Sequence, residues 1–138
     1  MSEIDLHRSV ADFLNWIVMP PAVWTTFPAG WTGMRVGAAG RLKACGLKAG
    51  MPDILIFHDS FTLGIELKAR TKPTPVQINM MNKLRLAGVP VVIATSIDDV
   101  ERTLRTYKIP MRKISYGASL TQTEVRRPQE PAQGAAQA

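Results

Sequence analysis

Several features are missing from this chain of 138 residues, and each absence excludes a class of protein. Cysteine occurs once, as Cys45, so neither an internal disulfide framework nor a zinc site built from several cysteines is expected. No apolar run approaches the ~18 residues of a membrane span, and no basic segment precedes an apolar one near the N-terminus. We therefore expect a soluble, intracellular (cytoplasmic) protein with no membrane partner.

The overall composition is that of a folded globular domain with an excess of positive charge. Hydrophobic residues make up 46% of the chain and charged residues 20%, and the length suits one domain with its own core. The formal net charge of +6 indicates an anionic partner, either a nucleic acid or another anionic surface.

The segment 28–50 contains no acidic residue and is rich in glycine. Flexible backbone combined with unpaired basic side chains is typical of a loop that contacts phosphates. The alternative is a solvated loop that happens to be basic. A short helix near residues 37–45 is compatible with either. The candidate nucleic-acid-binding residues of this segment are Arg35, Arg41, Lys43, Lys48 and Trp31.

Helical periodicity and capping signals predict the helices. Apolar residues from Leu6 to Ile17 recur at helical spacing, which predicts an amphipathic helix over residues 3–18. Thr74, Pro75 and Gln77 form a capping-box start for a helix that ends near Gly88. We expect its inward face to carry Ile78, Met81, Leu84 and Leu86.

The remaining segments complete an α/β pattern. Residues 22–27 are β-branched and aromatic and predict a strand, and residues 89–95 predict a buried strand after a crossover helix. Ser96 is a suitable cap for a last helix to about residue 107, with Val100 and Leu104 facing inward. Residues 126–138, rich in Pro, Gln, Ala and Gly, are expected to be disordered.

Charged side chains stand on two short apolar strands that a polar turn joins within residues 50–68. Asp53 opens the first strand, while Glu66 and Lys68 share one face at the end of the second. Twelve residues separate the two carboxylates, so a hairpin can bring them together across adjacent strands. Two unpaired carboxylates at that range repel unless a cation joins them, and Mg²⁺ accepts such oxygen ligands. Water bound to the metal could attack a phosphodiester, with the lysine assisting.

These motifs resemble a known family. Pro52-Asp53, followed by a hairpin that ends in Glu66-Leu67-Lys68, resembles the signature of the PD-(D/E)XK nuclease superfamily. The flanking residues 46–50, Gly64-Ile65 and Gln77 resemble the VRR-NUC family, small nuclease domains common in phage and bacterial genomes. The resemblance runs over residues 3–100. It implies an α/β, restriction-endonuclease-like core, with a small mixed β-sheet, flanking helices and αβββαβ order.

The resemblance also implies roles for particular residues. Asp53, Glu66 and the backbone carbonyl of Leu67 would hold Mg²⁺ or Mn²⁺, and Lys68 would be the catalytic lysine. Gln77 matches a glutamine that the family places near the catalytic site, and Glu3 an acidic residue that can join the metal site. Both residues also have a purely structural explanation. Gln77 could serve only as a helix cap, and Glu3 could serve only as a negative charge that favours a helix N-terminus.

The chain departs from the family pattern in two places, and several other conspicuous residues are expected to have structural roles only. The asparagine that relatives often carry near residues 27–30 is absent here, and residues 111–138 have no counterpart. His7 is expected on a helix surface and His58 at the hairpin turn, both outside the catalytic site. Trp16 and Trp24 are expected in the core.

Together, these observations predict a metal-dependent DNA endonuclease in residues 1–110, followed by an extension over 111–138. It would be structure-selective or junction-resolving, and the second role would require a homodimer with paired active sites. The alternative is a non-catalytic nucleic-acid-binding module on the same fold. A third interpretation is a structural partner in a larger phage or replication assembly.

Overall fold

The computed structural model describes residues 1–27 and 37–114 of the chain. The predictions for Trp31, Arg35 and the C-terminal tail lie outside these residues. The described elements are, in order, α1 (Glu3–Ile17), β1 (Val23–Thr26), α2 (Ala38–Ala44), β2 (Ile54–His58), β3 (Phe61–Leu67), α3 (Pro75–Leu86), β4 (Val91–Ala94) and α4 (Ile97–Thr106). The predicted αβββαβ order is therefore confirmed, with α2 inserted and α4 added.

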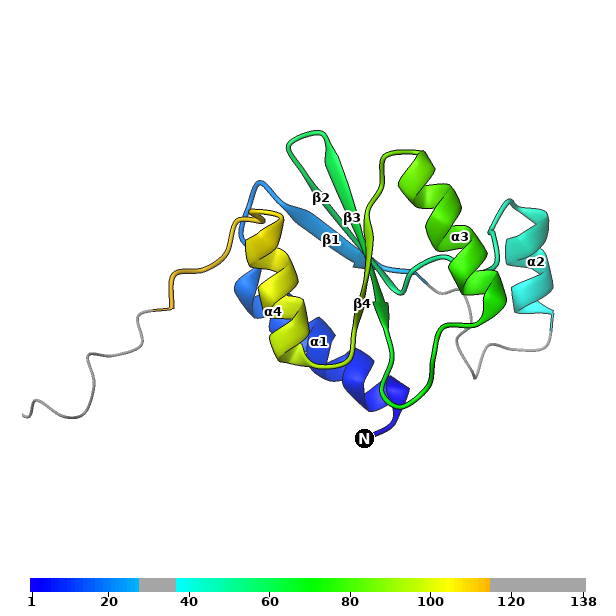
Figure 1. Ribbon diagram of the computed structural model, residues 1–138, viewed down its shortest axis with the longest axis horizontal. Coiled ribbons are helices and arrows are strands. Elements are labelled where there is room, and N and C mark those ends of the chain that lie inside the picture. Colours follow the sequence, from blue (N-terminus) through cyan, green and yellow to red (C-terminus); the bar gives the residue numbers. More distant parts are fainter. Residues whose placement is uncertain (28–36, 115–138) are drawn as a thin grey trace, which may run out of the picture.

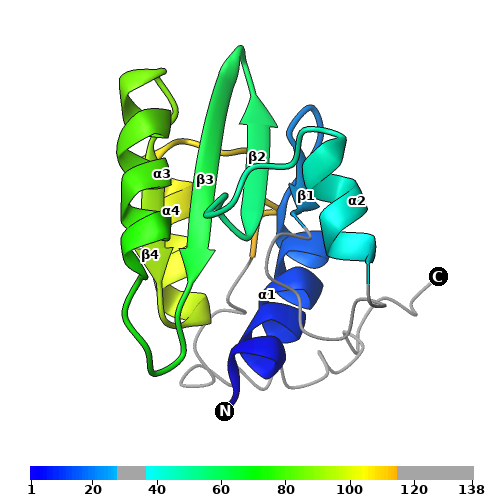
Figure 2. The same cartoon turned by 90° about the vertical axis from the view of Figure 1, so that its right-hand side faces the viewer.

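The four strands form one mixed sheet in the order β1-β2-β3-β4 (Figures 1 and 2). β1, β2 and β3 pair antiparallel, whereas β4 pairs parallel to β3 after the crossover through α3. A two-residue turn, Asp59–Ser60, joins β2 to β3, and both residues have positive φ angles of 49° and 59°. This geometry is that of the hairpin turn that matches the natural twist of two strands.

Helices α1 and α4 cover one face of the sheet and enclose the core, on the side opposite α3 and α2 (Figure 1). Alternate residues of β2 point into this core, because strand side chains alternate between faces. The predicted inward residues Val100 and Leu104 are fully buried, as are Val10 and Leu14 of α1. Ser2 caps α1 and Ser96 caps α4.

Helix α3 lies on the other face, beside β4, and here two predictions hold only in part. Of the expected inward face only Met81 is buried, whereas Ile78 is 47% and Leu86 91% exposed. The strand β4, predicted to be buried, is buried only in part: Val91 and Ala94 are buried, whereas Ile93 is exposed at the edge of the sheet. Most of α3 is exposed because the helix contacts the sheet mainly at β4, and Ile93 is exposed because β4 lies at the edge of the sheet.

The predicted tryptophan burial is also partly wrong. Trp16 is exposed and lies beneath the guanidinium of Arg112, whose Cζ is 5.9 Å from the ring centroid. Trp24 packs against the core while remaining partly exposed. Among residues 1–27 and 37–114, no helix is long and apolar enough to cross a membrane.

Candidate active site

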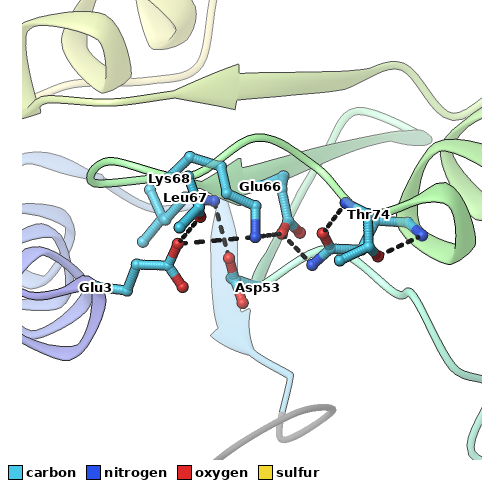
Figure 3. A network of polar contacts seen from close by, with 8 residues as sticks. Glu3, Asp53, Glu66, Leu67, Lys68 and Thr74 are labelled. Carbon is cyan, nitrogen blue, oxygen red and sulfur yellow. Dashed lines mark hydrogen bonds and ion pairs between the residues drawn. The ribbon is translucent and has the colours of Figure 1, made fainter.

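The predicted site residues meet where β3 ends and β2 begins, between the N-terminal turns of α1 and α3 (Figure 3). β3 is the strand next to β4, and its last five residues are buried on both faces. Glu66 is only 1% exposed and Lys68 only 7%. Charged side chains are rarely buried to this extent unless they are paired, so their partners decide what the site can do.

Asp53 is held on both its side chain and its backbone. Its Oδ2 accepts a hydrogen bond of 2.8 Å from the backbone N–H of Leu67. Its carbonyl oxygen accepts the backbone N–H of Phe27 at 2.8 Å and the hydroxyl of Thr26 at 3.0 Å. The carboxylate of Asp53 is therefore fixed against the end of β3.

Glu66 receives two donors on the same oxygen. Its Oε1 lies 2.5 Å from Nε2 of Gln77 and 3.2 Å from Nζ of Lys68. The Oε1 of Gln77 in turn accepts the backbone N–H of Thr74 at 2.9 Å, which completes the predicted capping box. One side chain thus makes both the helix cap and the contact with Glu66, while a catalytic role for Gln77 stays a prediction.

The pKa values of Glu66 and Asp53 are both raised, so the positive charge around the two carboxylates does not fully stabilise their charged forms. Burial, and next the nearby Asp53 carboxylate, raise the pKa of Glu66 to about 7, against the opposing effect of Lys68. Burial also raises the pKa of Asp53, although the Leu67 N–H opposes the shift. A cation placed between the two carboxylates would stabilise their charged forms.

Lys68 follows the last residue of β3, and its backbone N–H donates to the carbonyl of Ala94 at 3.0 Å. Its ammonium lies 3.2 Å from Glu66 Oε1 and 3.8 Å from Glu3 Oε1, which places it between two carboxylates. The predicted proximity of Lys68 and Glu66 is therefore present, and the ammonium faces the site (Figure 3).

Glu3 contacts the lysine side of the site. Besides Lys68, its Oε1 accepts the hydroxyl of Thr71 at 2.5 Å, so Glu3 also ties α1 to the loop after β3. Within the described part of the chain, no group of three or more His, Cys, Asp or Glu side chains is arranged to hold a metal. The structure therefore brings the carboxylates of Asp53 and Glu66 together, and metal ligation by these two and by Glu3 stays a prediction.

The donor set of this pair fits a hard divalent ion. Asp53 Oδ2 and Glu66 Oε1 already accept hydrogen bonds, which leaves each carboxylate a second oxygen as a potential ligand. Mg²⁺ commonly takes one or two protein carboxylates and completes its octahedron with water. The carbonyl of Leu67, next to Glu66 in the chain, is the predicted third protein ligand.

Sequence reasoning missed two residues beside Asp53. His7, expected on the helix surface, is partly buried, and its Nε2 lies 2.8 Å from Oγ1 of Thr26. The one available signal was spacing, because His7 lies one helical turn after Glu3 and so on the same face of α1. For Thr26, nothing in the sequence marks the contact. His58 ends β2 at the hairpin turn, as predicted.

The predicted basic surface is present in part. Arg41, Lys43 and Lys48 are exposed, and α2 has no buried residue at all. Two further basic residues, Arg70 and Lys72, are exposed in the loop that follows Lys68 and were not among the predicted contacts. Exposed basic side chains therefore stand on α2, shortly after it, and in the loop that follows Lys68.

Comparisons with known proteins place the fold. No protein-family model matches the chain, and no curated protein matches it in sequence. The chain is similar to a solved structure described as a "VRR_NUC domain protein", with a TM-score of 0.54 and 23% identity over 78% of this chain and 88% of that one. The likeness confirms the predicted restriction-endonuclease-like α/β fold with its four-stranded mixed sheet.

Proposed function

We propose that this chain is a VRR-NUC-type, divalent-metal-dependent nuclease that hydrolyses DNA phosphodiester bonds, with the nuclease domain in residues 1–110. The observation that carries the proposal is the pairing of two carboxylates with raised pKa values, the partly buried Asp53 and the buried Glu66, beside the buried ammonium of Lys68. Groups with strongly perturbed pKa values cluster at functional sites, and the fold is one on which this chemistry occurs.

The chain supplies the parts that phosphodiester hydrolysis needs. A Mg²⁺ or Mn²⁺ ion held by Asp53, Glu66 and the Leu67 carbonyl would make a water more acidic and offset charge on the phosphoryl oxygens. Lys68 presents a buried ammonium to the same space, where it can orient the attacking water and stabilise negative charge in the transition state. Gln77 holds Glu66 in place through Oε1.

DNA is the proposed substrate because the protein is basic. The net charge is +6, and the exposed side chains of Arg41, Lys43 and Lys48 can contact the phosphate backbone. Arg35 and Trp31 remain proposed contacts from the same segment. A structure-selective or junction-resolving activity belongs to this proposal, and junction resolution would require a homodimer.

A non-catalytic nucleic-acid-binding module is the second candidate. The carboxylate pair argues against it, because holding the partly buried Asp53 beside the buried Glu66 has a free-energy cost that binding a polyanion does not require. A site-specific metal would offset that cost.

A cleavage panel tests the proposal. Duplex, flap and four-way-junction DNA would be incubated with Mg²⁺, Mn²⁺ or EDTA and wild-type, Lys68→Ala or Asp53→Asn protein. We expect metal-dependent cleavage that both substitutions abolish.

Lys108→Ala is the control, since Lys108 is an exposed lysine after α4, outside the network around Glu66. Full cleavage by folded Lys68→Ala protein would contradict the role of Lys68. The absence of any Mn²⁺ affinity that Asp53→Asn removes would favour the binding module.

A further inference from the structure

A chain of hydrogen bonds connects α1 to the backbone of Asp53. His7 Nε2 lies 2.8 Å from Thr26 Oγ1, and Thr26 Oγ1 lies 3.0 Å from the carbonyl oxygen of Asp53. The chain crosses three separate elements, because His7 belongs to α1, Thr26 ends β1, and Asp53 precedes β2.

The chemistry of the three groups fixes the direction of this chain. A carbonyl oxygen only accepts hydrogen bonds, so the single hydroxyl proton of Thr26 is donated to Asp53. The hydroxyl oxygen must then accept from His7, which requires a proton on Nε2 of the imidazole. The neighbouring N–H of Phe27 donates to the same Asp53 carbonyl at 2.8 Å, so the end of β1 holds this peptide at two points.

We propose that His7 and Thr26 are positioning residues that set the orientation of Asp53 for metal binding. This inference rests on the proposed function. The Leu67 N–H fixes one carboxylate oxygen of Asp53, and the His7–Thr26 chain fixes the peptide from which the carboxylate extends. Neither His7 nor Thr26 touches the metal or the substrate in this scheme. Groups that orient a metal ligand typically change metal affinity by 10–100-fold when they are removed.

Mn²⁺ binding to the full-length protein tests the proposal without any need for catalysis. Titration calorimetry would compare wild type with His7→Ala and Thr26→Val, each of which breaks the chain at one member. We expect each variant to bind Mn²⁺ about 10-fold more weakly. Because both act through the same hydrogen bonds, the double variant should be no weaker than the weaker single variant.

Conservative variants separate positioning from simple loss of packing. Thr26→Ser keeps the hydroxyl, and His7→Gln keeps an N–H donor at a similar reach, so both should restore most of the affinity. Thr25→Val is the matched control, because Thr25 is the adjacent exposed threonine and its hydroxyl donates to the backbone carbonyl of Thr26, not to Asp53. Unchanged Mn²⁺ affinity in folded His7→Ala protein, or fully additive losses in the double variant, would overturn the proposal.

A spectroscopic measurement on the protein in EDTA tests the direction of the hydrogen bond between His7 and Thr26. Long-range ¹H–¹⁵N spectra at pH 8 should show the ring of His7 with its proton on Nε2, and Thr26→Val should change that signal. The chain has only one other histidine, so His58→Gln assigns the spectrum. A proton on Nδ1 alone would contradict the inferred direction. If wild-type protein binds no Mn²⁺, the proposed function fails and the role of His7 fails with it, even where the spectra show the hydrogen bond.

Discussion

The side-chain amide of Gln77 joins a helix cap to a buried carboxylate: its nitrogen lies 2.5 Å from Glu66 Oε1, and its oxygen accepts the Thr74 N–H at 2.9 Å. The start of α3 and the end of β3 are therefore coupled through one residue. Any change to Gln77 affects the helix and the site together, unless the replacement keeps one of the two contacts.

Gln77→Glu is such a replacement. A glutamate keeps the oxygen that caps α3. It replaces the amide N–H group that donates to Glu66 with a carboxylate oxygen, which cannot donate while charged. We expect a loss of about 1–3 kcal/mol in the free energy of unfolding at pH 8, because a second acceptor replaces the donor that faced Glu66. At pH 5 the loss should be small, because a shared proton restores a donor. Urea unfolding at both pH values measures this, and equal losses at the two would contradict it. Gln77→Ala is the comparison, because it removes the cap contact at either pH.

The raised pKa of Glu66 predicts how the stability of the metal-free protein depends on pH. Its pKa rises from an ordinary value of 4.5 to about 7 in the folded state. Between these values the folded protein binds more protons than the unfolded chain. The free energy of unfolding therefore falls as pH rises, by at most about 1.4 kcal/mol per pH unit from this group. Urea unfolding in EDTA from pH 4.5 to 8 would show this slope.

Glu66→Gln is the control for that dependence. A glutamine cannot titrate, so the slope between pH 4.5 and 7 should become shallower. Asp53, whose pKa is also raised, contributes a decline of the same sign that the variant retains. An unchanged slope in Glu66→Gln protein would assign the pH dependence to other groups.

Gly50 couples the loop before β2 to α3. Its φ angle is +80°, and an added Cβ would lie 2.7 Å from the backbone carbonyl oxygen of Val76. We expect Gly50→Ala to lower the free energy of unfolding by about 2–4 kcal/mol, because backbone strain and a steric clash add. Gly46→Ala is the matched control, since Gly46 also has a positive φ, but among the described residues other than its chain neighbours none comes within 4 Å of the added Cβ. Thermal unfolding of both variants separates the two effects, and equal losses would exclude a contribution from Val76.

The basic surface of α2 predicts a dependence of DNA binding on salt. If Arg41 and Lys43 contact phosphates, replacing either by Ala should reduce the slope of log K against log salt by about 1. Binding would be measured by fluorescence anisotropy in EDTA, so that no cleavage occurs. Arg105→Ala is the control, because Arg105 is on α4, on the opposite face of the sheet, and pairs with Glu101. Unchanged slopes for Arg41→Ala and Lys43→Ala would move the DNA contact elsewhere, with Arg70 and Lys72 the next residues to replace.

The sequence predicts local features of this fold well because short-range chemistry determines them. The capping residues Ser2, Thr74 and Ser96, the helical spacing of α1 and the hairpin around residues 59–60 all depend on neighbours within a few positions. The pairing of Asp53 with Glu66 was also predictable, since the hairpin fixes which residues lie opposite each other.

Contacts between distant elements could not be derived in this way. Leu86 continues an apolar pattern, yet it is exposed because of where α3 lies over the sheet. The bond between His7 and Thr26 joins residues 19 positions apart on different elements. Glu3 was predicted on the correct helix, but its contacts with Lys68 and Thr71 depend on how the loop after β3 folds back.

The two-residue turn Asp59–Ser60 has a consequence for how this chain can change. Ile54 pairs with Ile65, and continuing that register by one step sets Asp53 opposite Glu66. Inserting or deleting one residue at the turn would shift the pairing and direct the opposite side chain of β3 toward Asp53. The length of this turn is therefore constrained by a carboxylate pair at the other end of the hairpin.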